Sequence, residues 1–321
     1  MLNSTRRQFL ASSAGVAALG LTGSLAFAPA AQAADLRKKG HYTYKIGDIE
    51  VTSVYDGIWE NQLFDIISPG NPANVIKSNL KEAGHSDKFI PIEYAFTVVK
   101  TGGRIILIDA GTGDQLQPTA GLASRGGLEA AGISPSNVDM VLISHMHPDH
   151  IYGLMEKDTN APVYPNAEIL VSETDYNYWT DASLLSTLPE FRRDLAKRIQ
   201  ATFPTWKNVS RFSGEKEVAP GVRAVKSFGH SPGHMSYHLS SGNDQLLLLG
   251  DAIIVPALFL RNLDWQLAFD ADRDQASATR KAIVAQVIAD DVMISGYHFG
   301  FPNSGKIKKD EGSHIFIPTT I

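Results

Sequence analysis

The sequence predicts an α/β fold in which mixed β-sheets and helices form a sandwich. Three observations predict it: strand-like apolar runs recur along the chain, helical patterns lie between them, and two strand-like runs are joined as a hairpin. Because strands paired in hairpins run in opposite directions, we expect mixed sheets rather than one strictly parallel sheet with alternating helices.

The strand-like runs are short, and several are rich in β-branched residues. Residues 49–55 alternate between apolar and polar positions, as a half-buried strand does. Residues 96–100 and 104–108 flank Thr101-Gly102-Gly103, which is typical of a tight hairpin turn. Five further runs complete the set: 138–143, 168–171, 222–227, 245–249 and 292–295.

Two longer helices are predicted from apolar residues at helical spacing. Phe191, Leu195 and Ile199 are four residues apart and define one apolar face. The second helix is predicted with Asp272 or Asp274 as its N-cap. Its apolar face consists of Ala276, Ile283, Val284, Val287 and Ile288. Ser134-Pro135 indicates a further helix start, with proline at the first helical position. We interpret the periodic residues as core.

The composition limits which partners, metal ligands and nucleophiles this chain can use. The 321 residues are 43% hydrophobic and 20% charged, which is ordinary for a globular protein. A net charge of −5 argues against a nucleic-acid partner, because backbone binding needs a basic surface. The absence of cysteine excludes disulfides, thiolate ligands and a cysteine nucleophile. Any metal must therefore be held by histidine and carboxylate, a set compatible with zinc, iron, manganese or cobalt.

Residues 1–33 are predicted to be a twin-arginine export signal. Arg6-Arg7 precede a modestly apolar stretch, and Ala31-Gln32-Ala33 is a small-residue cleavage site. The alternative is an uncleaved membrane anchor, but glycines and serines make the stretch only weakly hydrophobic. We therefore expect a periplasmic or secreted protein with residues 34–321 as one domain and no stable membrane insertion after cleavage.

His145-Met146-His147-Pro148-Asp149-His150 places four potential metal ligands directly after the strand-like run 138–143. Residues two apart in an extended chain point the same way, so His145 and His147 can bind one metal. The chain then turns, and Asp149 and His150 face the opposite side. The alternative is four packed side chains without a metal, which would leave their desolvation uncompensated. The arrangement therefore predicts two metals lying close together.

Three later segments also place a candidate ligand after an apolar run. They are 228–234, which contains His230 and His234, then Gly250-Asp251, and 296–300, which contains His298. Glycine beside each ligand lets the backbone turn sharply and approach a metal. Taken alone, Gly-Asp after a strand is more often a turn than a metal site. Position alone leaves either His230 or His234 as the ligand.

With these motifs in this order, the sequence resembles the metallo-β-lactamase superfamily. His-x-His-x-Asp-His is the signature of that superfamily, and Ile108-Asp109-Ala110-Gly111 resembles its earlier Asp-x-Gly motif. The resemblance covers residues 45–321 and implies a four-layer αββα sandwich. The site is then expected at one edge, between the two sheets.

The resemblance also implies a role for each candidate ligand. The first metal would be bound by His145, His147 and His234. The second metal would be bound by Asp149, His150 and His298. Asp251 would bridge the two metals. The superfamily pattern Gly-His-x-Pro-Gly-His selects His234 and leaves His230 to orient its neighbours. Asp109 would orient a histidine ligand or help to position Asp149.

The function implied by the resemblance is a dinuclear metallohydrolase. Two divalent ions, zinc or alternatively iron, manganese or cobalt, would share one water and hold a bridging hydroxide at neutral pH. The same ions would polarise a carbonyl or phosphoryl oxygen. The chain has no Gly-x-Ser-x-Gly elbow, and this mechanism needs no serine nucleophile. Asp149 and Asp109 are the side chains we expect to be catalytic.

Within the superfamily, the sequence most resembles exported methyl-parathion-hydrolase-like enzymes and their lactonase relatives. This resemblance rests on the export signal, on residues 172–179 and on Phe269-Asp270-Ala271-Asp272. The aromatic-rich segment 172–206 is expected to form a lid or wall over the metals, with Tyr152 and Trp179 contacting the substrate. The alternative is that these aromatic residues pack in the core or in a homodimer interface.

An apolar, aromatic pocket suits a neutral lactone, aryl ester or phosphotriester. We therefore expect hydrolysis of a lactone, such as an acyl-homoserine lactone, with methyl parathion-like triesters as native or promiscuous substrates. The alternatives are a glyoxalase-II-like thioesterase or aryl esterase, or a non-catalytic metal-binding member of the fold. The complete ligand set argues against the last of these.

Overall fold

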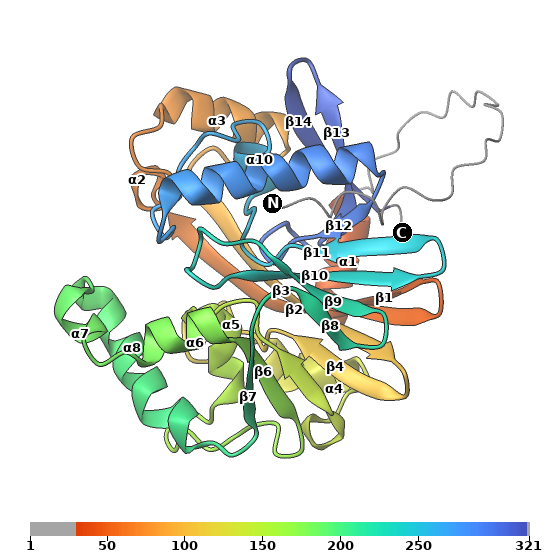
Figure 1. The fold of residues 1–321 in the computed structure, drawn as a ribbon. Coiled ribbons are helices and arrows are strands. Elements are labelled where there is room, and N and C mark those ends of the chain that lie inside the picture. The colour runs from red at the N-terminus through yellow and green to blue at the C-terminus, as the bar shows by residue number, and fades with distance from the viewer. Residues whose placement is uncertain (1–29, 320–321) are drawn as a thin grey trace, which may run out of the picture.

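The computed structural model describes residues 30–319, in which two seven-stranded β-sheets pack face to face with helices on their outer sides (Figure 1). The strands follow the chain order β1 to β7 across the first sheet and β14 back to β8 across the second. In Figure 1, α3 and α10 lie on one outer side, and α5, α6 and α8 lie on the other. This confirms the predicted four-layer sandwich.

The first sheet is antiparallel from β1 to β4 and parallel from β4 to β7. Its strands are β1 (His41–Ile46), β2 (Ile49–Gln62), β3 (Ile90–Thr101), β4 (Arg104–Ile108), β5 (Met140–Leu142), β6 (Glu168–Ser172) and β7 (Val209–Phe212). The second sheet is antiparallel except where β11 and β12 pair in parallel. Its strands are β8 (Lys216–Ala219), β9 (Val222–Lys226), β10 (Met235–Ser241), β11 (Asp244–Leu248), β12 (Met293–Ser295), β13 (Ser304–Asp310) and β14 (Ser313–Pro318). Both sheets are therefore mixed, as predicted.

The helices vary widely in length. They are α1 (Ala30–Lys39), α2 (Phe64–Ile67), α3 (Ala73–Glu82), α4 (Leu128–Ala130), α5 (Pro148–Ile151), α6 (Glu173–Thr180), α7 (Leu184–Thr187), α8 (Glu190–Thr202), α9 (Pro256–Phe259) and α10 (Arg273–Ala289). Short helical segments of other types also occur. The π-helical segment is η1 (Ala123–Gly127), and the 3-10 helices are η2 (Pro135–Asn137), η3 (Tyr152–Leu154) and η4 (Phe203–Thr205). Asp272 caps α10 by accepting a hydrogen bond from Gln275 N at 3.0 Å, which decides between the two predicted caps.

The hydrophobic core has an inner layer and two outer layers. Val51 and Leu142 from the first sheet and Tyr237 from the second belong to the buried cluster between the sheets. On the outer side, α8 buries Leu195 and Ile199. Phe191 is an exception to the predicted apolar face, because it remains 71% exposed. Its position near the start of α8 places it beyond the packed part of the helix.

The predicted hairpin between β3 and β4 is confirmed. Thr101 and Arg104 are paired across the turn, so only Gly102 and Gly103 form the loop. Both glycines have positive φ, +56° and +75°, as a type I′ turn requires.

Most of the predicted export signal lies outside the described residues. Residues 30–33, its last four, form the beginning of α1. Within residues 30–319, no helix combines the length and the apolar character that crossing a membrane demands.

Candidate metal centre

Most of the candidate ligands come together at one edge of the sandwich because their segments follow parallel strands. Asp109 comes directly after β4, and the run from His145 follows the neighbouring parallel strand β5. In the second sheet, Asp251 follows β11 and His298 follows its parallel neighbour β12. The carboxyl ends of parallel strands lie at the same edge of a sheet, so these four segments converge.

The first cluster consists of His145, His147 and His230, whose ligand atoms lie within 4.8 Å of one another. The Nδ1 atom of His147 is 2.8 Å from His145 Nε2 and 3.0 Å from His230 Nε2. Three imidazoles converging on one point form the kind of donor set that proteins use for zinc and similar ions.

The second cluster consists of Asp149, His150, Asp251 and His298. His298 Nε2 lies 3.3 Å from Asp149 Oδ2 and 3.2 Å from Asp251 Oδ2, and His150 Nε2 lies 3.3 Å from Asp251 Oδ1. Asp251 also reaches the first cluster, because its Oδ2 is 3.4 Å from His230 Nε2. It therefore lies between the clusters, where the resemblance placed a bridging ligand.

The structure differs from the sequence expectation at the two histidines of segment 228–234. His234 lies outside both clusters: its Nδ1 is 2.7 Å from Ser227 Oγ, and its Nε2 accepts a hydrogen bond from Asp251 N at 3.0 Å. Both ring nitrogens are thus occupied, which leaves none for a metal. His230 takes the expected place of His234 in the first cluster. His234 instead holds the backbone of Asp251, the expected bridging ligand.

Each of three candidate ligands is oriented by an acceptor on the far side of its ring. His150 Nδ1 donates to Asp109 Oδ2 at 2.8 Å, and His230 Nδ1 donates to Asp270 Oδ1 at 2.9 Å. His298 Nδ1 donates to the carbonyl oxygen of Glu93 at 2.8 Å. These bonds commit the Nδ1 protons and leave the Nε2 lone pairs facing the clusters. Asp109 thus makes the contact that the first of its two expected roles requires, whereas the contacts of Glu93 and Asp270 were not anticipated from the sequence.

Asp175 is a third residue whose role was not predicted from the sequence. This buried carboxylate on α6 accepts hydrogen bonds from Met146 N at 2.8 Å and from Gly233 N at 3.1 Å. A Cβ at Gly233 would lie 2.3 Å from Asp175 N, so only glycine fits there. Asp175 therefore ties the two ligand-bearing loops of the first cluster together from behind.

The pKa values of histidines are shifted in opposite directions in the two clusters. Burial lowers the pKa of His145 and His147 well below the ordinary value, and neighbouring histidines add to the effect. In the second cluster burial acts in the same direction, but Asp251 and Asp149 outweigh it and raise the pKa of His298 to about 9. The pKa of His150 is also raised well above its ordinary value, against burial, by Asp251, Asp149 and Asp109.

The donor set fits divalent metal ions. His150 Nε2 and Asp251 Oδ1 are buried and lie 3.3 Å apart, but within residues 30–319 neither atom forms a hydrogen bond of acceptable geometry, which is unusual for buried polar atoms. The carboxylates around His150 and His298 favour a positive charge, and a divalent cation supplies one while displacing the histidine protons. A cation held by this cluster would satisfy both orphaned atoms.

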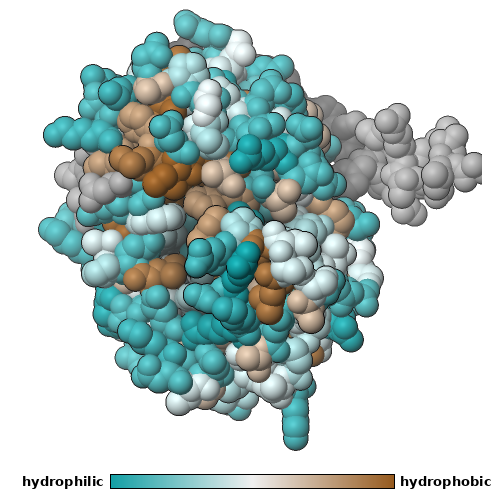
Figure 2. All heavy atoms as spheres, turned by 90° about the vertical axis from the view of Figure 1, so that its left-hand side faces the viewer, coloured by the Kyte–Doolittle hydropathy of each residue, from teal (hydrophilic) through white to brown (hydrophobic). Residues whose placement is uncertain are grey.

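A cavity of about 380 Å³ lies over the two clusters. His147, Asp149 and His230 line it together with a mainly apolar wall. That wall includes Trp59, Ile67, Ile92, Tyr94, Leu195, Ile254, Leu267 and Phe269. Figure 2, which faces the side of the molecule where α2 and α7 lie in Figure 1, shows hydrophobic atoms gathered around the middle of that face.

The aromatic segment 172–206 contributes to the cavity differently from the expectation. Tyr152 lines the cavity, but Trp179 does not: it is buried, with its ring centroid 5.9 Å from that of His147. Phe203 is buried in the core as well. The segment reaches the cavity through Phe191, Arg192, Asp194 and Leu195 of α8. It is therefore a wall made by one helix, and its buried aromatic residues support that wall from behind.

We expect Asp109→Asn to weaken metal binding by about 10- to 100-fold, the usual effect of losing a carboxylate that orients a histidine ligand. An asparagine NH2 group facing His150 Nδ1–H would place two donors against each other. Chelator competition measures the affinities. Asp139→Asn is the matched control. Asp109 accepts a backbone hydrogen bond from Ser144 N at 2.7 Å, and Asp139 accepts one from Ile105 N at 2.7 Å but lies outside the clusters. Equal affinities in both variants would contradict the orienting role of Asp109.

Comparisons with known proteins agree with this geometry. Residues 94–298 match the family model described as the metallo-beta-lactamase superfamily. An N-acyl homoserine lactonase of Bacillus cereus is 26% identical over 122 residues, which are 38% of this chain and 41% of the relative. A Bacillus thuringiensis N-acyl homoserine lactonase is 28% identical with the same coverage. The chain thus matches about two fifths of the length of these curated relatives.

Two solved structures resemble almost the whole described chain. AidC, a dizinc quorum-quenching lactonase in complex with a product, is 26% identical and superposes with a TM-score of 0.82, covering 88% of this chain and 98% of AidC. The hydrolase AbOPH of the beta lactamase superfamily has a TM-score of 0.80 at 24% identity, again covering 88% and 98%. The likeness to AbOPH shows the fold alone.

Proposed function

Because this chain belongs to the metallo-beta-lactamase superfamily, we propose that it is a metal-dependent hydrolase whose principal reaction is the opening of a lactone ring. The observation that carries the proposal is the placement of the two ligand clusters beside a mainly apolar cavity. The likeness to AidC over 98% of that lactonase supports the substrate class, and an N-acyl homoserine lactone is the substrate we propose.

The site is proposed to hold two divalent ions, zinc in both positions, with iron, manganese or cobalt as alternatives that the same donors accept. When bound, such ions activate water and polarise a carbonyl oxygen. His145, His147 and His230 would hold one ion, and Asp149, His150 and His298 the other. Asp251 would contact both, and the Asp109–His150 hydrogen bond would keep the His150 ring in position.

The cavity walls would orient the substrate. The ester carbonyl must reach the clusters beside Asp149 and His230, so the remainder of the substrate lies against the apolar wall. Burial of an acyl chain there removes apolar surface from water and contributes binding free energy without a charged partner. A charged nucleotide would gain little from this wall.

A second candidate activity is hydrolysis of aryl phosphotriesters. Trp59 and Phe269 support it: both line the cavity, and their ring centroids lie 6.4 Å apart, so they offer aromatic contacts to an aryl leaving group. We propose it as a secondary activity of the same site, since a neutral triester carries the same kind of polarisable oxygen as an ester.

Export through residues 1–33 belongs to the same proposal. The paired Arg6-Arg7 and the Ala31-Gln32-Ala33 site support a mature chain that acts in the periplasm or outside the cell. Sequencing the N-terminus of protein recovered from the periplasm tests this. A mature chain beginning near residue 34 supports export, and a chain that stays in the cytoplasm with its first residues intact overturns it.

The decisive experiment is a substrate panel on purified protein of known metal content. The panel contains N-acyl homoserine lactones of several chain lengths, an aryl phosphotriester, an aryl ester and a thioester, each with and without chelator. We expect the lactones to be opened fastest, with activity lost on chelation and restored by zinc. Fully metallated protein that opens no lactone would overturn the proposal. Preference for the thioester or the aryl ester would favour those activities instead.

We expect Phe191→Ser to raise KM for long-chain lactones by about 5- to 10-fold, which corresponds to about 1–1.4 kcal/mol of lost apolar contact. Phe191 lines the cavity yet is largely exposed, so its replacement should leave the fold and kcat unchanged. Leu122→Ser is the control, because Leu122 is an exposed apolar residue that does not line the cavity. The same KM increase for short-chain and long-chain lactones would show that Phe191 does not contact the acyl chain.

A further inference from the structure

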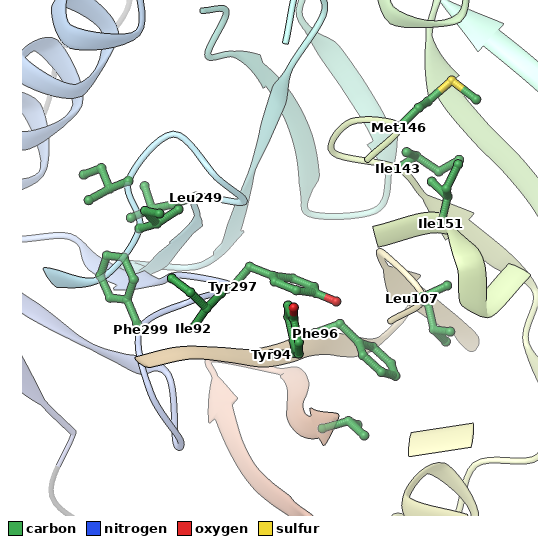
Figure 3. Packing of buried hydrophobic residues seen from close by; sticks show 14 of the residues in the cluster. Ile92, Tyr94, Phe96, Leu107, Ile143, Met146, Ile151, Leu249, Tyr297 and Phe299 are labelled. Carbon is green, nitrogen blue, oxygen red and sulfur yellow. The ribbon is translucent and has the colours of Figure 1, made fainter. Parts of the chain in front are cut away.

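The loop that carries His298 lies along a free edge of β3. β4 pairs with β3 only from Thr97 to Thr101, so residues 93–95 extend beyond it. The loop between β12 and β13 takes the free place: Ala95 N donates to Tyr297 O at 3.1 Å, and Asn303 Nδ2 donates to Ala95 O at 3.1 Å. Figure 3 shows Tyr297 beside Tyr94 of β3. The two ring centroids are 6.4 Å apart.

Glu93 fixes His298 through its backbone. Its carbonyl oxygen accepts the Nδ1 proton of His298 at 2.8 Å, and the opposite ring nitrogen then faces Asp149 and Asp251. A displacement of residue 93 would therefore change the direction in which His298 offers its lone pair.

The side chain of Glu93 is held from outside the sheet. Glu93 is only 7% exposed, and Arg37 of α1 donates to both of its carboxylate oxygens, from Nε at 3.1 Å and from Nη2 at 2.7 Å. Among residues 30–319, Arg37 is the only cation that forms an ion pair with Glu93. A nearly buried carboxylate without a counter-ion is costly, and a two-pronged guanidinium contact is the strongest way to stabilise it.

A small apolar cluster attaches α1 to the same loop. Leu36 packs against the cluster of Tyr55, Ala95 and Phe301, and the Tyr55 and Phe301 ring centroids are 5.3 Å apart. Phe301 lies three residues after His298. α1 therefore contacts both the strand residue that orients His298 and the loop that carries it.

From these contacts we propose that Arg37 is a positioning residue of the metal centre: by holding Glu93, it keeps His298 in the orientation that binds the second metal. The inference rests on the proposed dinuclear site. It gives the beginning of the described chain a role in metal retention, although Arg37 does not line the cavity.

The test compares Arg37→Met with Lys100→Met in the full chain. Lys100 pairs with Glu50 at 2.8 Å near the other end of β3, so its variant also breaks an ion pair on that strand, but away from the clusters. Chelator competition gives the affinity of each metal, and cobalt substitution gives an absorption spectrum that reports the ligand geometry. We expect Arg37→Met to lower the binding affinity of one of the two metals by about 10-fold or more and to change the absorption spectrum of cobalt bound there. We expect Lys100→Met to have the affinities and the spectrum of the parent protein.

Two further variants keep the result interpretable. Arg37→Lys retains the charge but not the two-pronged contact, so we expect its metal affinity to lie between those of the parent and Arg37→Met. This variant replaces Arg37→Met in the test if Arg37→Met fails to fold. Adding Glu93→Gln to Arg37→Met removes the unpaired charge and should recover part of the affinity. Parent-like affinities and spectra in both Arg37 variants would overturn the inference, as would lower stability with unchanged metal binding. If the parent protein itself binds no metal, the proposed function fails first and the inference with it.

Discussion

Asp251→Asn is expected to lower kcat/KM by two to three orders of magnitude and to remove at least one of the two metals. Asp251 faces His230 on one side and His150 and His298 on the other, so its carboxylate supplies negative charge to both clusters. Asparagine is nearly the same size but neutral, and breaking a buried charge-paired network by removing one charge costs about 3–5 kcal/mol. Metal analysis together with steady-state kinetics on a lactone measures both effects.

Asp244→Asn is the control for this prediction. Asp244 begins the same strand, β11, but lies at its exposed far end, so its replacement should change neither metal content nor turnover. The hydrogen bond from the backbone N of residue 251 to His234 Nε2 does not depend on the side chain at position 251. Asp251→Asn should therefore keep the local backbone conformation, and a loss of activity would reflect the loss of the carboxylate charge. An Asp251→Asn protein with two metals and parent-like turnover would contradict the bridging role.

The second large effect is expected from His230→Gln, and His234→Gln provides its matched comparison. His230 Nε2 points into the first cluster, so His230→Gln should lose the first metal and leave about 1% of the activity or less. At position 234, a glutamine amide can replace both hydrogen bonds of the imidazole, donating to Ser227 Oγ and accepting from Asp251 N. His234→Gln should therefore retain both metals.

Metal content and cobalt spectra of the two variants decide between the histidines. Loss of the first metal in His234→Gln, with retention in His230→Gln, would restore the assignment that the sequence pattern favoured. A fall in unfolding free energy of His234→Gln without metal loss would agree with the structure, because that residue is buried and holds a loop.

Local patterns were enough to predict most of the fold. The alternation in 49–55 and the glycine pair after Thr101 correctly predicted a strand and a hairpin, because both depend on neighbouring residues only. The apolar face of α8 was predicted less well. Periodicity identifies positions on one side of a helix, but it does not show how far the covering layer extends, and Phe191 lies beyond it.

The candidate site was predicted only as far as ligand types and strand ends allow. Segment 228–234 offers two histidines, and only the three-dimensional course of its turn decides which one faces the clusters. Partners distant in sequence were also out of reach: Glu93 and His298 are 205 positions apart, and Asp175 and Gly233 are 58 apart. No spacing rule connects such residues. Trp179 illustrates the same limit, since an aromatic residue near a site can line a cavity or support it from behind.

The two halves of the sandwich contribute separately to the metal centre. His145, His147, Asp149 and His150 follow a strand of the first sheet, whereas the other proposed ligands, His230, Asp251 and His298, follow strands of the second. Bound ions would therefore act as cross-links between the sheets, and their binding free energy would add to the free energy of unfolding. Free metal at a thousand times the dissociation constant contributes about 4 kcal/mol per site. The melting temperature should then rise with free metal concentration, so the ions would stabilise the packing of the two sheets in addition to their role in catalysis.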